Sequence, residues 1–323
     1  MNFYTIGHVT EDIVPRSHVS GAVVYSAVAA MKLGFRAHII TKIPQKHPYV
    51  RQLEKMGIVV YPLPIRQSNI KKGLTSFKNF FSKDGNREQV VTDTQERITV
   101  EDLDFFPSFP DNSVILIASV VAEVEEALFP ILEKLGYFTA TPQGYFRKIQ
   151  KSGKVKQIVW RKISSLSYSR ITVFSEEDIT INNSGFSRKL LLERLIMHSS
   201  VTVLTCGRNG SLVYKNTPKE PIRIKAFELS SNEPVNLSGA GDVYATAFII
   251  HFLQYQDLKE AALFASLYAS LKIAEKEKLG GIGASTVPSL LTIKKFICGN
   301  KSRIGNFLRS NNSKILRVPH FPS

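Results

Sequence analysis

A carboxylate that directly follows three small residues is the feature of this chain most suited to chemistry. In the stretch NLSGAGDVYATAF, residues 236–248, Asp242 comes after Gly239, Ala240 and Gly241. The apolar pattern that follows predicts a helix whose first turn carries Asp242. Backbone N–H groups in such a turn lack intrahelical partners and, with the helix dipole, form a site for an anion. Asp242 is then either an ordinary N-terminal helix residue or a carboxylate that addresses a proton or a cation beside the anion.

The elements that would position this turn alternate between short apolar strands and helices. Such alternation is typical of βα units in a mostly parallel sheet. Strands are predicted at residues 2–7, 36–43, 58–65, 113–119, 137–142, 169–175 and 200–207. Helices are predicted at residues 21–34, 47–57, 240–254 and 258–278. The helix at 240–254 therefore belongs to a large α/β domain.

One segment interrupts the alternation. Residues 73–95 (GLTSFKNFFSKDGNREQVVTDTQ) alternate by twos around Asp84 and Gly85, which predicts a β-hairpin. Strands that pair with each other, outside the parallel sheet, indicate a small β lid over an active site. We expect the lid strands within about residues 8–20 and 60–93.

Size and composition limit the classes of protein that remain. A chain of 323 residues that is 43% hydrophobic can bury the core of one large domain. It has no apolar run of about 18 residues and no secretory signal pattern at its N-terminus. Cys206 and Cys298 are too far apart for a disulfide framework or a metal cluster, so we expect a cytoplasmic protein. The Walker motif G-x-x-x-x-G-K-[ST] is absent, which excludes a P-loop NTPase.

Positive charge is concentrated in two segments. Residues 143–170 contain eight Lys or Arg and no acid, and residues 291–323 contain seven and no acid, which together equal the net charge of +15. Such patches suit phosphorylated ligands or a weak attraction to nucleic acid, unless they are only solvated surface. Residues 298–323 are expected to form a partly ordered basic tail.

The GAGD string before an apolar helix, in a chain with this alternation, resembles the ribokinase-like (phosphofructokinase B, PfkB) family of small-molecule kinases. The resemblance covers about residues 1–297, which we expect to be the kinase domain. It implies a three-layer α/β fold, with a mostly parallel central sheet between helices and a small β lid. It also implies that Asp242 takes the proton of a substrate hydroxyl, while the amides of Gly239, Ala240 and Gly241 hold the transferring phosphoryl group. The family has Asp and Thr where this chain has Asn236 and Leu237.

Three stretches resemble the family's acceptor-binding motifs. GHVTED, residues 7–12, would place Asp12 on substrate hydroxyls, although a surface aspartate at a strand end is the alternative. SGAVVYSAVAAMKLG, residues 20–34, supplies Gly21 and has Tyr25 where the family has Asn, as in a branch that includes inositol-type kinases. TPQGYFR, residues 141–147, resembles inositol-type members and implies that Gln143 and Arg147 face substrate or phosphate. A packing role is the alternative for Arg147.

Two further stretches resemble the nucleotide-binding motifs of the family. TCGRNG, residues 205–210, resembles T-x-G-x-x-G, whose hydroxyl and amides meet nucleotide phosphates, which implies roles for Thr205, Gly207 and Gly210. An ordinary hairpin is the alternative. GGIGASTVPS, residues 280–289, resembles the adenine-side loop and implies that Gly283 and Ala284 contact the nucleotide. A simple loop is the alternative there.

The metal-related motif departs from the family's N-x-x-E. In FSEED, residues 174–178, Ser175 and Asp178 occupy the two positions. Mg²⁺ prefers a few oxygen ligands and retains waters, so Ser175 and Asp178 are expected to serve Mg²⁺ through water. The alternative is helix capping, with Ser175 as N-cap and acids in the first turn. Both can hold at once.

The resemblance therefore implies an ATP- and Mg²⁺-dependent kinase that phosphorylates a hydroxyl of a sugar or cyclitol. Two alternatives stay open. A nucleoside kinase of the same fold would need an aromatic pocket, for which the candidates are Phe77, Phe80, Phe81, Phe105 and Phe106. A catalytically weakened member would bind nucleic acid or another ligand through the basic segments. Otherwise we expect no membrane and no nucleic acid as partners, and a monomer or a homodimer formed through the lid.

Overall fold

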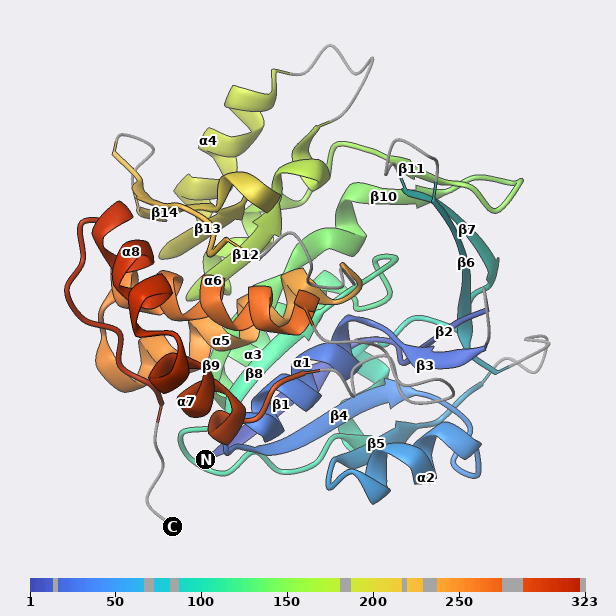
Figure 1. Cartoon of the computed structure of the whole chain (residues 1–323). Coiled ribbons are helices and arrows are strands. Elements are labelled where there is room, and N and C mark those ends of the chain that lie inside the picture. The colour runs from blue at the N-terminus through green and yellow to red at the C-terminus, as the bar shows by residue number, and fades with distance from the viewer. Residues whose placement is uncertain are drawn as a thin grey trace.

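A large, mostly parallel sheet is the centre of the fold. The computed structural model describes residues 1–13, 17–66, 73–81, 87–180, 187–216, 220–228, 237–274 and 287–319. Within these residues, nine strands form one sheet in the order β15-β14-β13-β12-β9-β8-β1-β4-β5 (Figure 1). Neighbours from β5 to β13 are parallel, whereas β14 and β15 run antiparallel at one edge. The strands are β1 (Asn2–Ile6), β4 (Arg36–Lys42), β5 (Val59–Leu63), β8 (Val114–Ala118), β9 (Tyr137–Thr141), β12 (Ile171–Ser175), β13 (Val201–Thr205), β14 (Ser211–Lys215) and β15 (Ile222–Ile224).

Helices cover both faces of this sheet and create two cores. Along β8, Val114, Leu116 and Ala118 face the first core, and Ile115 and Ile117 face the second. A strand buried on both faces reads as a continuous apolar run, which is why the sequence predicted it. The first core is covered by α1 (Ala22–Lys32), α2 (Pro48–Lys55), α5 (Ala240–Tyr255), α6 (Leu258–Ala274), α7 (Leu290–Gly299) and α8 (Lys301–Ser310), and the second by α3 (Phe129–Leu135) and α4 (Arg188–His198).

This three-layer α/β arrangement confirms the predicted fold class (Figure 1). All seven predicted strands of the central sheet and all four predicted helices are present, with ends shifted by a few residues. The sequence did not predict the short 3₁₀ helices that follow several strands. In the described part of the chain, no helix combines the length and apolar character that a membrane crossing requires. The 3₁₀ helices are η1 (Val100–Phe105), η2 (Glu126–Leu128), η3 (Pro142–Phe146), η4 (Ile163–Tyr168), η5 (Glu176–Ile179) and η6 (Gly207–Asn209).

A second sheet of four strands stands beyond the carboxyl end of β1 (Figure 1). Its order is β3-β2-β6-β7, and β6 and β7 pair antiparallel as the hairpin pattern predicted. The hairpin β10–β11 is a separate two-stranded sheet that lies beside β7, where the Val91 N–H donates to the Gly153 carbonyl over 2.8 Å. The predicted turn at Asp84 and Gly85 lies outside the described residues. The strands are β2 (Thr10–Asp12), β3 (His18–Ser20), β6 (Thr75–Phe81), β7 (Arg87–Asp93), β10 (Arg147–Ile149) and β11 (Val155–Gln157).

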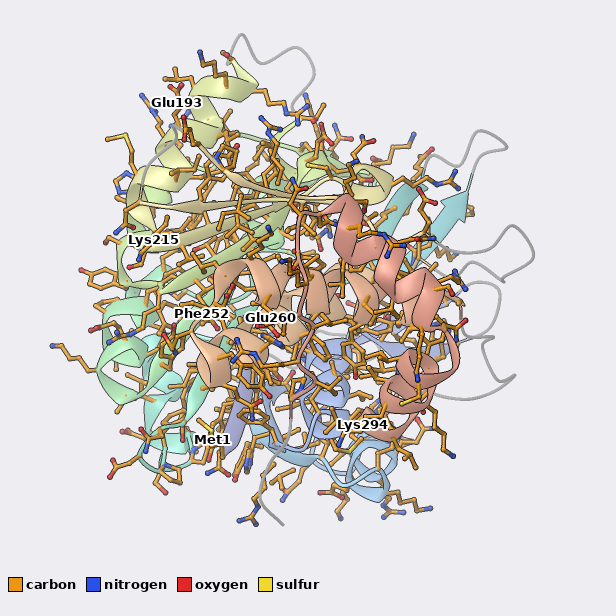
Figure 2. The ribbon with its side chains drawn as sticks, turned by 60° about the vertical axis from the view of Figure 1, so that its left-hand side comes forward. Met1, Glu193, Lys215, Phe252, Glu260 and Lys294 are labelled. Carbon is orange, nitrogen blue, oxygen red and sulfur yellow. The ribbon has the colours of Figure 1, made fainter. Side chains whose placement is uncertain are left out.

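The described part of the C-terminal segment, up to residue 319, packs on the domain. Helix α8 buries Ile304 and Phe307 in the first core. Beyond it, Arg317 forms an ion pair with Glu260 of α6, the residue labelled in Figure 2. The Arg317 carbonyl lies 3.0 Å from His251 Nε2. The sequence argument weighed only the basic charge of this segment. Apolar residues three apart give α8 a buried face, while its Lys and Arg remain outside.

Candidate active site

Several residues singled out by the sequence lie along the carboxyl-terminal edge of the parallel strands. Ser175 ends β12 and Thr205 ends β13, and the two are partners in register. Gln143 follows β9 within η3. Strand β1 lies between β4 and β8, so the direction of strand order reverses at β1. Open α/β sheets bind ligands in the crevice outside the carboxyl ends of the strands at such a point, which makes this edge the candidate site.

The turn before α5 adopts a left-handed conformation at Gly239, where φ is 71°. A side chain is strained in that region, and glycine is not. Ala240 begins α5, and Asp242 lies partly exposed in its first turn. A Cβ atom added at Gly241 would meet no described atom within 4 Å, so there is open space beside the turn. The turn and the helix start thus have the form that the sequence predicted.

Tyr25 of α1 forms the floor of this turn. Its side chain is buried, and a Cβ atom at position 239 would stand 2.2 Å from the Tyr25 ring. Lys272 of α6 lies beside them: its ammonium donates to the Ser238 carbonyl and stands 5.4 Å from the centroid of the Tyr25 ring. The sequence analysis overlooked Lys272. The sequence feature that could have indicated Lys272 is that it is the single charged residue in the helical stretch from Leu263 to Ala274.

Two of the predicted acceptor residues lie where the lid joins α1. Gly21, the N-cap of α1, has φ of 110°, and a Cβ atom there would approach the His8 carbonyl to 2.9 Å. The close approach and the positive φ both require glycine. Asp12 lies on lid strand β2, with its Oδ2 3.8 Å from Nε2 of His18 on β3. Asp12 and Gly21 are thus set at the lid side of the candidate site.

Gln143 and Arg147 belong to a segment that is tied to the loop after β8. The Arg147 guanidinium donates to the Val120 carbonyl over 3.3 Å, so at least part of this side chain has a packing role. Glu123 anchors the same loop, because its buried carboxylate accepts from the N–H groups of His8 over 3.1 Å and Val120 over 2.9 Å. Glu123 joins the ends of β1 and β8. No motif in the sequence indicated this role.

The predicted phosphate-binding residues Thr205, Gly207 and Gly210 lie in the hairpin between β13 and β14. Thr205 Oγ1 donates to the Phe174 carbonyl over 3.4 Å. Gly210 has φ of 90°, and a Cβ atom there would overlap the Ile224 carbonyl at 1.9 Å. The hairpin alternative therefore explains Gly210. Gly207 lies on the open side of the turn, where a Cβ atom would meet no described atom within 4 Å. Gly283, Ala284 and Asn236 lie outside the described residues.

Ser175 and Asp178 form a reciprocal capping box at the start of η5. The Ser175 N–H donates to Asp178 Oδ2 over 2.8 Å, and the Asp178 N–H donates to Ser175 Oγ over 3.3 Å. Both side chains are thus engaged by the backbone, as the capping alternative stated. Among the described residues, no group of three His, Cys, Asp or Glu could hold a metal ion. The two residues do not by themselves make a ready metal site.

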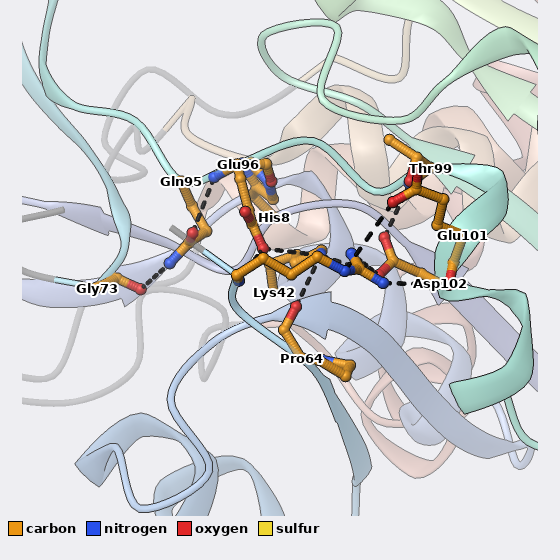
Figure 3. Close-up of polar contacts among 10 residues, drawn as sticks. His8, Lys42, Pro64, Gly73, Gln95, Glu96, Thr99, Glu101 and Asp102 are labelled. Carbon is orange, nitrogen blue, oxygen red and sulfur yellow. Dashed lines mark hydrogen bonds and ion pairs between the residues drawn. The ribbon is translucent and has the colours of Figure 1, made fainter. Parts of the chain in front are cut away.

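A buried network of charges at the end of β4 was not predicted (Figure 3). The fully buried Lys42 ammonium donates to Glu96 Oε1 and Asp102 Oδ1, each over 2.9 Å, and to the Pro64 carbonyl over 2.7 Å. Arg66 donates to Asp102 over 2.6 Å. Two cations thus meet two carboxylates, which is the condition under which buried charge is tolerated.

The pKa of Asp102, within the network, and the pKa of His8, beside it, are both shifted from their ordinary values. Burial raises the pKa of Asp102, but the Thr99 N–H, Lys42 and Arg66 outweigh burial and hold that pKa below the ordinary value of 3.8. Burial lowers the pKa of His8, whose ring lies 3.0 Å from the Glu96 carbonyl and 2.8 Å from the Thr75 hydroxyl. His8, just after β1, links the end of that strand to lid strand β6 and to Glu96 in the segment after β7. The network therefore connects the base of the lid to the central sheet.

Comparison with known proteins agrees with this architecture. Residues 16–280 match the model of the pfkB family carbohydrate kinase. The 5-dehydro-2-deoxygluconokinase of Bacillus subtilis (strain 168) is 23% identical over 269 residues, which cover 80% of this chain and 81% of that enzyme. The nucleoside kinase of Methanothermobacter thermautotrophicus is 35% identical over 80 residues, 25% of this chain and 24% of that protein.

One solved structure with the same fold contains two ligands. It is a pyrophosphate-dependent kinase of the ribokinase family in complex with a pyrophosphate analog and myo-inositol. Its identity to this chain is 20% and the TM-score is 0.67, with 88% of this chain and 98% of that one covered. The glycine turn at the start of α5, the three layers and the match over residues 16–280 lead to one conclusion. The chain belongs to the pfkB family of carbohydrate kinases, which are phosphotransferases.

Proposed function

We propose that this protein transfers the γ-phosphoryl group of ATP to a hydroxyl of a sugar or cyclitol. The observation that carries the proposal is the left-handed Gly239 turn that opens α5 with Asp242 in the first helical turn. Asp242 accepts the hydroxyl proton, the acceptor oxygen forms a bond to the γ-phosphorus, and the bond from that phosphorus to the bridging oxygen of ADP breaks. Charge stabilisation and in-line positioning dominate such a reaction. The amides of Gly239, Ala240 and Gly241 would supply both, with the Ala240 N–H shared between the phosphoryl group and the Leu237 carbonyl, to which it donates over 3.2 Å.

Asp242→Asn tests the base. The amide keeps the shape of the carboxylate and cannot take a proton, so kcat should fall at least about 10²-fold while nucleotide affinity stays close to that of the wild type. Steady-state turnover and calorimetric ATP binding measure the two quantities. Asp257→Asn, at the start of α6, is a control for loss of one carboxylate at a helix start. Turnover within a fewfold of wild type in Asp242→Asn would overturn the assignment.

The proposed donor is ATP, with Thr205 and Gly207 at its phosphates and Gly283 and Ala284 at its adenine side. Ser175 and Asp178 would hold Mg²⁺ through water, since the backbone engages both side chains, and the ion would neutralise charge on those phosphates. Pyrophosphate is the competing donor, because it is named for a protein of the same fold. Turnover should be measured with each donor, with Mg²⁺ and with EDTA. If pyrophosphate supports turnover and ATP does not, the protein is still a phosphotransferase, but the assignment of ATP as its donor is wrong.

The proposed acceptor is a polyhydroxylated six-carbon compound, either a ring cyclitol or a sugar acid. Asp12, Gly21, Tyr25, Gln143 and Arg147 would surround it. The names of two similar proteins, 5-dehydro-2-deoxygluconokinase and the myo-inositol complex, support this class over pentoses. The acceptor should be identified by ADP release across inositols, hexoses, ketogluconates, pentoses and nucleosides. Highest kcat/KM for a pentose would contradict the class.

A nucleoside kinase is the second candidate, because the Methanothermobacter relative carries that name. Its aromatic pocket is not supported by the described side chains. Phe77 packs in the first core, Phe106 packs against the second, and Phe105 is exposed. The nucleosides in the acceptor screen decide between the two candidates.

The proposed assembly is a monomer or a homodimer formed through the lid. In the lid sheet, β10–β11 already lies beside β7, which leaves β3 as the other edge strand. The first basic segment includes β10–β11 and the second includes α8, and these elements lie at opposite sides of the view in Figure 1. Light scattering at several concentrations measures the assembly state, and a mass above that of a dimer would contradict it.

A further inference from the structure

A lysine with no assigned role lies beneath the proposed anion site. Lys272, on α6, is fully buried. An ammonium in an apolar interior is costly unless it is paired with suitable acceptors. Its neighbours one turn back on the same face of α6 are Ala269 and Tyr268, and the Tyr268 hydroxyl donates to the Pro288 carbonyl over 2.7 Å. The contacts of the Lys272 ammonium with other elements show where its charge acts.

Two contacts of this ammonium lead to the same turn. Lys272 Nζ donates to the carbonyl of Ser238, the residue directly before Gly239. It also lies 5.4 Å from the centroid of the Tyr25 ring, at the distance of a cation–π interaction. The same ring packs against the backbone of Gly239. Lys272 thus contacts the turn directly and supports it through Tyr25.

The contact with Ser238 fixes the direction of an amide. In a trans peptide the carbonyl of one residue and the N–H of the next point in opposite directions. Because the Ser238 carbonyl points at Lys272, the Gly239 N–H points away from Lys272. The lysine thereby orients an N–H donor and, at the same time, places a positive charge behind it. A charge in the low-dielectric interior of a protein acts on neighbouring groups far more strongly than a charge in water does.

We propose that Lys272 is a positioning residue for phosphoryl transfer, a built-in cation that holds the 238–239 peptide and raises the positive potential of the anion turn. The inference rests on the proposed function, because it assumes that a phosphoryl group binds at this turn. Lys272 does not touch the acceptor in this account. Its loss should therefore lower kcat and the affinity for phosphate-containing ligands, and leave the KM of the acceptor little changed.

The chain offers a matched control on the same helix. Lys259 of α6 also donates to a backbone carbonyl, that of Asn312, over 2.7 Å, but it is only partly buried and contacts the C-terminal segment. Lys272→Met and Lys259→Met remove the same charge from the same helix. Only the first removes the contact with the turn.

The experiment compares wild type, Lys272→Met and Lys259→Met as full chains, with the best acceptor from the screen. Removal of an oriented donor from an oxyanion hole lowers kcat about 10²–10³-fold. Lys272→Met keeps the Gly239 N–H but loses its orientation, so kcat should fall roughly 10–100-fold. Acceptor KM should stay within about twofold, and Lys259→Met should match the wild type. Calorimetric titration with inorganic pyrophosphate should show affinity at least about fivefold weaker in Lys272→Met only, since pyrophosphate probes the anion turn without turnover.

A second variant excludes a merely structural effect. Lys272→Ala leaves a cavity shaped for an alkylammonium, so propylammonium chloride should restore kcat at least about fivefold, whereas tetramethylammonium chloride at equal ionic strength should not. Unchanged kcat and pyrophosphate affinity in folded Lys272→Met, or no specific rescue by propylammonium in Lys272→Ala, would overturn the proposal. Absence of turnover in the wild type with every donor and acceptor would instead overturn the proposed function, while the pyrophosphate titration still tests Lys272.

Discussion

The ring of Tyr25 lies against the backbone of Gly239, so closely that a Cβ atom at position 239 would stand 2.2 Å from the ring carbons Cγ and Cδ1. Tyr25 comes from the first helix of the chain and Gly239 from the turn before α5. The contact joins the expected acceptor side of the site to the expected phosphoryl side. A change at either residue should therefore be felt at the other.

Gly239→Ala should disable the site. Alanine in the left-handed region costs roughly 1–2 kcal/mol, and the new methyl group would also collide with Tyr25. The turn must shift, so we expect kcat to fall at least about 10²-fold with a lower melting temperature. Turnover and thermal unfolding measure both. Gly241→Ala is the control for stability alone, because its Cβ atom meets no described atom within 4 Å. An active, equally stable Gly239→Ala would contradict the geometry.

Tyr25→Asn should change the acceptor preference. Tyrosine offers one hydroxyl and a broad apolar face, whereas asparagine offers a donor and an acceptor to adjacent hydroxyls. A buried polar group left unpaired costs about 1–3 kcal/mol, enough to shift preference by roughly ten- to a hundredfold. We therefore expect the ratio of kcat/KM between ribose and inositol to rise in the variant. If all acceptors lose activity in equal proportion, Tyr25 serves only to support Gly239 and Lys272.

Lys42→Met should destabilise the fold strongly. The substitution leaves Glu96 and Asp102 in a buried network without their central cation (Figure 3). Loss of one partner from a buried ion pair costs about 3–5 kcal/mol. Urea unfolding followed by circular dichroism measures the loss. Arg66→Met removes the partly exposed cation of the same network and should cost clearly less. Equal stabilities of the two variants would show that the buried position of Lys42 has no special weight.

The stability of the wild type in acid should depend on Asp102. Its pKa in the folded protein lies below the ordinary value of 3.8, so this carboxylate contributes stability above that pH. The contribution is lost as pH falls through the lower folded pKa, since the unfolded chain binds the proton first. The Asp102→Asn variant lacks this pH-dependent contribution to stability. The stability difference between wild type and variant should therefore be constant near neutral pH and shrink below about pH 4, measured by urea unfolding across that range. A difference that grows in acid would contradict the sign.

The local elements could be predicted from the sequence because their signals span only a few residues. Strands such as 114–118 are continuous apolar runs, and the hairpin around Asp84 and Gly85 shows period-two alternation. The turn at Gly239 was recognisable because glycine is the usual residue where the backbone takes a positive φ or lies close to a ligand. The family resemblance then supplied the order of the layers and the expected roles of Asp242, Thr205 and Asp12.

The contacts around the site were decided only by the tertiary structure. Lys272 meets Ser238 across 34 positions of sequence, and Lys42 meets Asp102 across 60. No local pattern encodes such pairs, because they depend on how α6 docks beside the turn and how η1 docks beside β4. The same holds for the C-terminal segment. Its basic charge favoured a tail, whereas in the structure α8 packs Ile304 and Phe307 into the first core. Sequence determined which residues could form helices, strands and an anion turn, and packing of distant elements determined which charges stand behind that turn.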